Sequence, residues 1–261
     1  MRFFDKYLKA REEKRSILCV GLDPAPPGMR PLPKRYAGKD AIEGMLAYCI
    51  DIVEKTGASC CATKANLQFV FPFSLRQFQK LNAAIHEQGL LSILDIKLSD
   101  IGSSNAASVY WIKEAGFDAL TFSPFAGNVR EGVELAHQKE LGIFVLTLMS
   151  NPEAKYFMKG EVAGIPAYRW IAREVREAGG DGVVVGATQA GRELEEIADI
   201  VGDGMIFLVP GVGAQGGNEE AVIKAVGKNL LINVGRSILN AEDPAQAARE
   251  FNERFNRLIG K

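Results

Sequence analysis

Two charged residues at the end of one apolar run carry the clearest chemical signal in this sequence. Asp95 and Lys97 stand in SILDIKLSDIGSSN, residues 92–105, with leucine or isoleucine on either side of each. Alternate side chains of a β-strand share a face, so we expect both charges on one face and the apolar residues on the other. An unpaired charge turned toward a protein interior costs several kcal/mol. The pair is therefore a candidate catalytic group, with a salt bridge at the strand end as the alternative.

Further charges stand at the ends of neighbouring predicted elements. Lys64 comes near the end of the preceding strand, and Asp23 closes the first strand. Asp100 opens the next helix, where a helix N-cap is the alternative role. A lysine between carboxylates stays protonated, so it can donate a proton and stabilise developing negative charge. A Schiff base would need a neutral amine, which nearby aspartates disfavour. The array therefore predicts a reaction that develops a carbanion.

Glycine-rich loops follow the last two predicted strands, VPGVGAQGGNEE at 209–220 and INVGRSI at 232–238. Glycine lets the backbone approach a ligand, and a following helix N-terminus offers free N–H groups to an anion. Arg236 can hold phosphate oxygens in bidentate fashion, and Gln215 can donate an amide N–H. The combination predicts a phosphate site, although turns alone also use glycine. Ser150, in LTLMSNP, is a candidate for a polar ligand edge or a plain turn residue.

These residues need a scaffold that brings many strand ends to one rim. Short runs rich in β-branched residues alternate with stretches of helical period along the whole chain. We expect strands at 17–23, 60–65, 91–97, 119–123, 143–150, 182–186, 205–209 and 231–235. We expect helices at 3–14, 40–56, 73–88, 103–115, 128–138, 166–178, 189–200, 218–226 and 243–257. The pattern predicts an α/β fold, a single (β/α)8 TIM barrel domain over 1–261 with an N-terminal extra helix. A doubly wound open sheet is the alternative, but no G-x-G-x-x-G follows the first strand.

Composition narrows the classes of partner. The chain has 261 residues, with 31 Lys+Arg against 32 Asp+Glu. Because nucleic acids and anionic membranes attract a surplus of Lys and Arg, we expect neither as a partner. The charged start, MRFFDKYLKAREEKR, lacks the apolar core of a secretory signal, and the strongest apolar run, 142–149, is too short for a membrane helix. We expect a cytoplasmic protein with reduced, buried cysteines, surface histidines and no protein metal site.

The segment DIKLSD at 95–100 is a D-x-K-x-x-D pattern, and with the rest of the chain it resembles the orotidine 5′-phosphate decarboxylase family, in its bacterial branch with longer chains. The resemblance covers nearly the whole length, through FDKYLKAREEKRSILCVGLDP, ATKANLQFV, LDIKLSDIGSSN, LTLMSNP, VPGVGAQGGN and INVGRSI. The single pattern is shared with sugar-phosphate relatives, whereas the ensemble is specific. It implies conversion of orotidine 5′-monophosphate to uridine 5′-monophosphate and CO2, a step of pyrimidine biosynthesis, without metal or organic cofactor.

The resemblance also implies catalytic roles. Lys97 would protonate C6 of the pyrimidine after CO2 departs, with Asp95 beside the leaving carboxylate and Lys64 completing the charged network. Asp100 and Ile101 would reach into the neighbouring subunit's site. The resemblance therefore implies a homodimer with active sites shared across the interface.

Binding roles follow in the same way. Asp23 and Lys64 would contact the ribose, as would Ser104 across the interface, where the family often has Thr. Ser150 would read the pyrimidine edge, and the loop 211–217 would close over the phosphate. The implied substrate-binding residues at the phosphate end are Pro210, Gly211, Gln215, Gly235 and Arg236.

Two other functions fit the residues. One is a metal-dependent sugar-phosphate decarboxylase or aldolase on the same barrel, with Asp95 binding Mg²⁺. The other is a non-catalytic protein that binds a nucleotide phosphate. Lys64 and LTLMSNP suit a nucleotide better than a sugar phosphate.

Overall fold

The computed structural model describes residues 1–261 apart from 27, 31, 39, 190, 213–217 and 261. Eight parallel strands close into a barrel in the order β1-β10-β9-β8-β5-β4-β3-β2. The barrel strands are β1 (Leu18–Gly21), β2 (Ala62–Asn66), β3 (Leu91–Leu98), β4 (Ala119–Phe122), β5 (Gly142–Leu148), β8 (Gly182–Val185), β9 (Ile206–Pro210) and β10 (Leu230–Val234). Each lies within two residues of its expected range at the start and end, and the predicted (β/α)8 barrel is confirmed.

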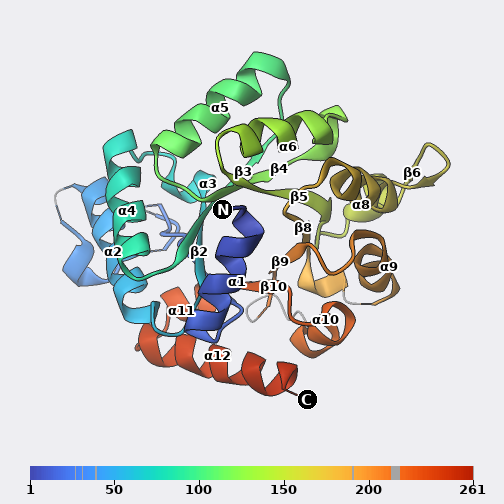
Figure 1. Cartoon of the computed structure of the whole chain (residues 1–261). Helices are drawn as coiled ribbons and strands as arrows, with labels where there is room; N and C mark the ends of the chain where they lie inside the picture. Colours follow the sequence, from blue (N-terminus) through green and yellow to red (C-terminus); the bar gives the residue numbers. More distant parts are fainter. Residues whose placement is uncertain (27, 31, 39, 190, 213–217, 261) are drawn as a thin grey trace.

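Helices surround the barrel, with at least one after each of the eight barrel strands (Figure 1). The longer ones match the sequence expectation: α1 (Phe3–Lys14), α2 (Ala41–Thr56), α4 (Leu75–Glu87), α5 (Gly102–Glu114), α6 (Val129–Gln138), α8 (Ala167–Ala178), α9 (Arg192–Val201), α10 (Glu219–Val226) and α12 (Pro244–Ile259). Their ends follow local signals. Ser74 and Gln77 form a reciprocal capping box that starts α4, and Gly179 ends α8 in the left-handed conformation.

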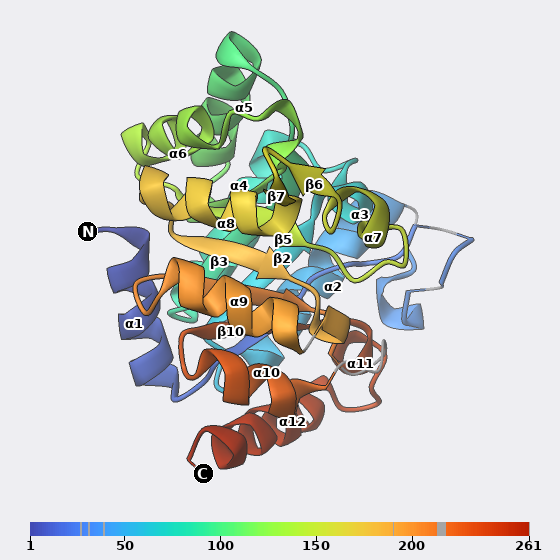
Figure 2. The same ribbon diagram turned by 90° about the vertical axis from the view of Figure 1, so that its right-hand side faces the viewer.

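Several short elements were not expected. They are α3 (Leu67–Val70), α7 (Ala154–Phe157), α11 (Arg236–Leu239) and a small hairpin of β6 (Glu161–Val162) and β7 (Ile165–Pro166). Figure 2 shows them at the end of the barrel opposite α1, where the chain leaves the carboxyl ends of the strands. The segment between the strand expected at 143–150 and the helix expected at 166–178 thus contains α7 and the hairpin.

Apolar residues fill two layers, one between barrel and helices and one inside the barrel. In β10, Ile232 packs toward the helices while Leu231 packs inside, as strand alternation requires. The helix α1 lies across one end of the barrel (Figures 1 and 2). Its Tyr7 is fully buried, and the hydroxyl donates to the Leu230 carbonyl at 2.8 Å. The extra helix therefore closes the amino end of the barrel, leaving the other end for ligands.

The expectations for the cysteines and the histidines are confirmed. All four cysteines are free and buried. Both histidines are exposed, and each also pairs with an aspartate, His86 with Asp118 and His137 with Asp181, each at 2.9 Å. Within the described part of the chain, no helix is long and apolar enough to cross a membrane.

Candidate active site

Three charged side chains meet at the carboxyl ends of β2 and β3. Lys64 Nζ lies 2.7 Å from Asp95 Oδ2, and Lys97 Nζ lies 2.8 Å from Asp95 Oδ1. We call Lys64, Asp95 and Lys97 the charged triad. The expected meeting of these residues is confirmed, because parallel pairing of β2 with β3 puts Asn66 opposite Asp95 and so brings Lys64 within reach.

The three side chains of the charged triad differ in their exposure to solvent. The Lys64 side chain is 5% exposed and the Asp95 side chain 12%, whereas the Lys97 side chain is 32% exposed. Burial raises the pKa of Asp95, but the Lys64 and Lys97 ammonium groups outweigh it and hold that pKa far below its usual value. Burial lowers the pKa of Lys64, and the nearby Asp95 and Asp23 carboxylates more than reverse this. Asp95 therefore stays ionised and Lys64 protonated near neutral pH.

The backbone of β3 departs from a regular strand at Lys97. Its φ is 54°, in the left-handed region, and the register with β4 shifts between Leu94 and Leu98. The expected alternation of side chains still holds, because Leu94, Ile96 and Leu98 pack in the outer core while Lys97 reaches Asp95 on the other face. Thr121, on β4, accepts a hydrogen bond from the Lys97 backbone N–H at 2.9 Å and donates one to Asp95 Oδ1 at 2.9 Å.

Sequence reasoning missed Thr121, since threonine is an ordinary strand residue. Leu120 and Phe122, on either side of it, face outward toward the helices, so strand alternation could have indicated that Thr121 faces into the barrel. Asn233 was also missed. It is a polar residue in the apolar run LLINV, and its buried Oδ1 has no hydrogen-bond partner among the described residues.

The first and last strands bring the expected ribose and phosphate residues together. Asp23 Oδ1 accepts a hydrogen bond from the Asn66 backbone N–H at 3.2 Å, which ties the end of β1 to the end of β2. A Cβ placed on Gly235 would lie 3.6 Å from Asp23 Oδ2, so the end of β10 passes directly beside that carboxylate. Arg236 follows as an exposed residue at the start of α11.

Other predicted residues stand on the same rim. Ser150 follows β5 and packs against Gly186, where an added Cβ would lie 2.6 Å from Ser150 Cβ. Pro210 ends β9, and Gly211 turns the chain with a φ of 99°. Gln215 lies outside the described residues.

Asp100, Ile101 and Ser104 do not join the charged triad within one chain. All three are exposed. Asp100 Oδ1 accepts a hydrogen bond from the Ile101 N–H at 2.8 Å, and among the described residues Asp100 forms no ion pair. Ile101, not Asp100, occupies the N-cap position of α5, so the N-cap alternative for Asp100 is wrong.

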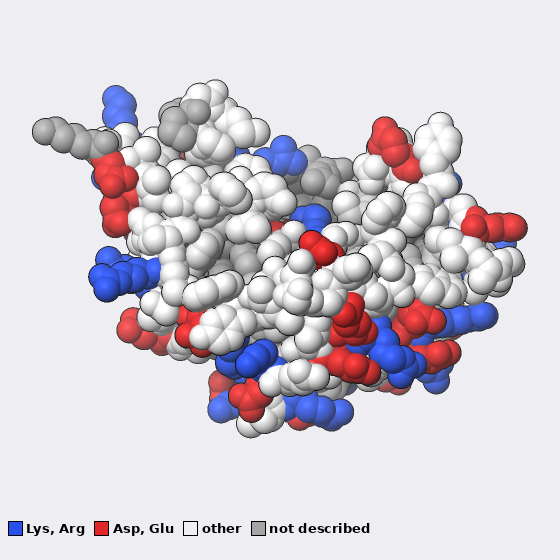
Figure 3. Space-filling model, turned by 90° about the horizontal axis from the view of Figure 1, so that it is seen from above, with Lys and Arg blue, Asp and Glu red and all other residues white. Residues whose placement is uncertain are grey.

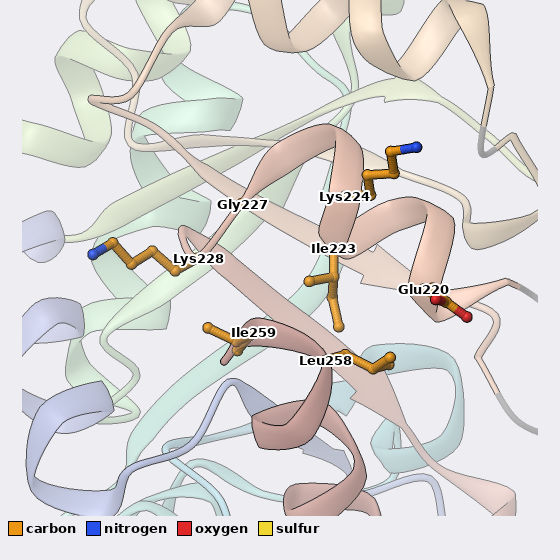
Figure 4. A pocket seen from close by; sticks show the side chains of 7 residues that line it. All are labelled: Glu220, Ile223, Lys224, Gly227, Lys228, Leu258 and Ile259. Carbon is orange, nitrogen blue, oxygen red and sulfur yellow. The ribbon is translucent and has the colours of Figure 1, made fainter. Parts of the chain in front are cut away.

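A separate cleft of about 530 Å³ lies between α10 and the end of α12 (Figure 4). Ile223, Leu258 and Ile259 line it, together with Lys224 and Lys228. None of the predicted site residues lines this cleft. Among the described residues, no three His, Cys, Asp or Glu side chains are grouped as metal ligands.

Comparisons with known proteins agree on one family. The family described as "Orotidine 5'-phosphate decarboxylase / HUMPS family" matches residues 16–251. The orotidine 5'-phosphate decarboxylase of Ralstonia pickettii is 37% identical over 267 residues, covering 95% of this chain and 94% of that protein. That of Cupriavidus taiwanensis is 36% identical over 281 residues, covering 100% and 98%. The solved OMP decarboxylase of Leishmania donovani matches with a TM-score of 0.83 and 26% identity over 100% of both chains.

Proposed function

Because this chain belongs to the orotidine 5′-phosphate decarboxylase / HUMPS family, we propose that it is a cytoplasmic carboxy-lyase of pyrimidine biosynthesis. Its reaction would convert orotidine 5′-monophosphate to uridine 5′-monophosphate and CO2. The observation that carries this proposal is the charged triad at the barrel rim, with one lysine open to a ligand and one buried beneath it.

In this reaction the bond between C6 and the carboxylate breaks, and the electron pair stays on C6 as CO2 leaves. The Lys97 ammonium then donates a proton to C6 and is itself reprotonated from solvent. Lys97 rather than Lys64 suits this role, because its side chain is 32% exposed while that of Lys64 is 5% exposed. Asp95 keeps Lys97 oriented, and the cations stabilise negative charge before the proton moves.

The rest of the rim would bind the nucleotide. Asp23 and Lys64 would hold the ribose, and Ser150 would read the pyrimidine edge. Phosphate contacts remote from C6 can stabilise a closed, water-poor site in which the decarboxylation occurs. The residues proposed for the phosphate end are Pro210, Gly211, Gln215, Gly235 and Arg236.

The geometry favours this reaction over a metal-dependent one. Both carboxylate oxygens of Asp95 are engaged by lysine ammonium groups, at 2.7 Å and 2.8 Å. A carboxylate that binds Mg²⁺ needs an oxygen free to coordinate it, and a divalent cation beside two ammonium groups would be repelled. We therefore propose catalysis without metal or organic cofactor.

We also propose a homodimer in which Asp100, Ile101 and Ser104 complete the partner's site. These residues are exposed beside the triad strand, and Ile101 is 62% exposed despite its apolar side chain. Trp111 on α5 is 57% exposed, and Phe125 after β4 is 74% exposed. Figure 3 shows the face over α5 and α6, where uncharged residues cover most of the middle around a few charged groups, and where charges gather along the lower edge and at both sides. Such a face is typical of an interface.

The first test mixes purified protein with orotidine 5′-monophosphate in EDTA and follows the loss of orotate absorbance. Turnover is expected, whereas its absence would refute the proposal. Lys97→Ala should lose nearly all turnover while still binding uridine 5′-monophosphate. Lys55→Ala is a matched control, since the Lys55 side chain is also 32% exposed and pairs with Asp51 at 2.7 Å. Turnover that disappears only in EDTA would instead support the metal-dependent reaction.

The shared site is tested by mixing two inactive variants, Lys97→Ala and Asp100→Ala, under conditions that exchange subunits. Each mixed dimer would contain one site with both native residues. Random exchange should therefore restore about a quarter of wild-type activity, because about half the dimers are mixed and each has one intact site of two. No recovery, despite mixed dimers shown by mass spectrometry, would contradict a site completed by Asp100.

A further inference from the structure

The backbone of β3 is irregular at Lys97, and a side chain of the neighbouring strand holds it there. Lys97 adopts a φ of 54°, which a non-glycine residue takes only when its surroundings hold it there. The register with β4 also shifts between Leu94 and Leu98, so Lys97 stands within the irregular part of the pairing. Its backbone N–H donates to the hydroxyl of Thr121 at 2.9 Å.

The same hydroxyl is bound to the catalytic carboxylate. Thr121 is 1% exposed, and its Oγ1 donates to Asp95 Oδ1 at 2.9 Å. Lys97 Nζ reaches the same oxygen at 2.8 Å. The contacts form a closed ring that runs from the Lys97 N–H to Thr121, on to Asp95, and back to Lys97 Nζ. The backbone N–H and the side-chain ammonium group of Lys97 are thus both bound to the pair formed by Thr121 and Asp95.

We propose that Thr121 is a positioning residue that fixes Lys97 for proton transfer, an inference that rests on the proposed function. A hydroxyl can donate one hydrogen bond and accept another at the same time, which this ring requires. Valine has the same shape without either capacity. Loss of the ring would leave the ammonium group of Lys97 on a backbone that is no longer held, while the ribose and phosphate contacts stay in place.

The test compares kcat, KM and binding of uridine 5′-monophosphate in Thr121→Val, Thr121→Ala and Thr121→Ser. We expect kcat to fall about 100-fold in the valine and alanine variants, the loss typical of a misplaced catalytic group, with product binding close to wild type. Thr121→Ser keeps the hydroxyl and should keep most of the activity. Thr147→Val is a matched control, because Thr147 is also buried in a barrel strand and, among the described residues, its hydroxyl donates only to the Val145 carbonyl.

The possible outcomes distinguish a failure of the proposed function from a failure of the proposed role of Thr121. Wild-type protein without turnover would overturn the proposed function and the role of Thr121 together. Wild-type turnover with undiminished kcat in both Thr121→Val and Thr121→Ala would overturn the role of Thr121 alone. Equal losses of kcat and of product binding would overturn positioning as well, since the residue would then serve binding. If Thr121→Val is too unstable to purify, Thr121→Ala decides the question, because it deletes the hydroxyl without adding an apolar methyl beside Asp95.

Discussion

Replacing Asp95 by asparagine should destabilise the protein by leaving a buried cation without its main counter-ion. Asn matches the shape of Asp, but it removes the charge and replaces one acceptor oxygen with an NH2 donor. Lys97 can turn toward solvent, since its side chain is 32% exposed. Lys64 cannot, since its side chain is 5% exposed. The cost of Asp95→Asn should therefore come mainly from Lys64.

The size of the effect follows from the distance and the burial. At an effective dielectric constant of about 20, opposite unit charges 2.7 Å apart attract by about 6 kcal/mol. Desolvation of both groups offsets part of that attraction, and removal of one partner of a buried pair typically costs about 3–5 kcal/mol. The nearby Asp23 carboxylate also raises the pKa of Lys64 and would remain. We therefore expect a loss of about 3 kcal/mol in the free energy of unfolding at neutral pH.

The stability lost in Asp95→Asn should depend on pH in a known direction. Because the pKa of Asp95 is lowered in the folded protein, its stabilisation is present above the unfolded value of about 4 and is lost as the pH falls toward the folded value. The difference in stability between wild type and Asp95→Asn should therefore be largest above about pH 4 and should shrink in stronger acid.

Urea unfolding at neutral pH measures the effect. Asp51→Asn is the control, because Asp51 pairs with Lys55 at 2.7 Å and with Arg35 at 3.0 Å on the surface. Its loss should stay below about 1 kcal/mol. If Asp95→Asn loses no more than this control, the reasoning about the buried pair is wrong. Adding Lys64→Met to Asp95→Asn should recover part of the loss, because the uncompensated charge is then gone.

Three further predictions test separate parts of the molecule. Arg236→Ala should weaken uridine 5′-monophosphate binding about 10- to 100-fold in calorimetry, yet leave uridine binding and Tm nearly unchanged, because Arg236 is exposed; a large fall in Tm would contradict this. The hydrogen bond to Asp181 raises the pKa of His137, so its stabilisation is present below about pH 6.5 and is lost at higher pH. His137→Gln should thus lower Tm more at about pH 5.5 than at about pH 8.5, and equal shifts would count against it. Tyr7→Phe loses the bond to the Leu230 carbonyl and should cost about 1 kcal/mol in urea unfolding; an unchanged midpoint would show that this hydrogen bond does not stabilise the docking of α1.

The barrel could be predicted because its signals are local. Runs of β-branched residues indicated the strands, and stretches of helical period indicated the longer helices. The unexpected helices α3, α7 and α11 have four residues each, about one turn, which is too short for helical periodicity to show. The histidines lie on the surface as expected, but their aspartate partners come from distant parts of the chain, which local signals do not reveal.

The sequence by itself determined which charges stand at the strand ends, and parallel pairing then made the meeting of Lys64 with Asp95 predictable. Only the tertiary structure decided how Lys97 is held. Its left-handed backbone, the register shift against β4 and the link through Thr121 depend on how two strands align. Periodicity along one strand carries no information about that alignment, because the bulge and its hydrogen bonds arise from packing between strands.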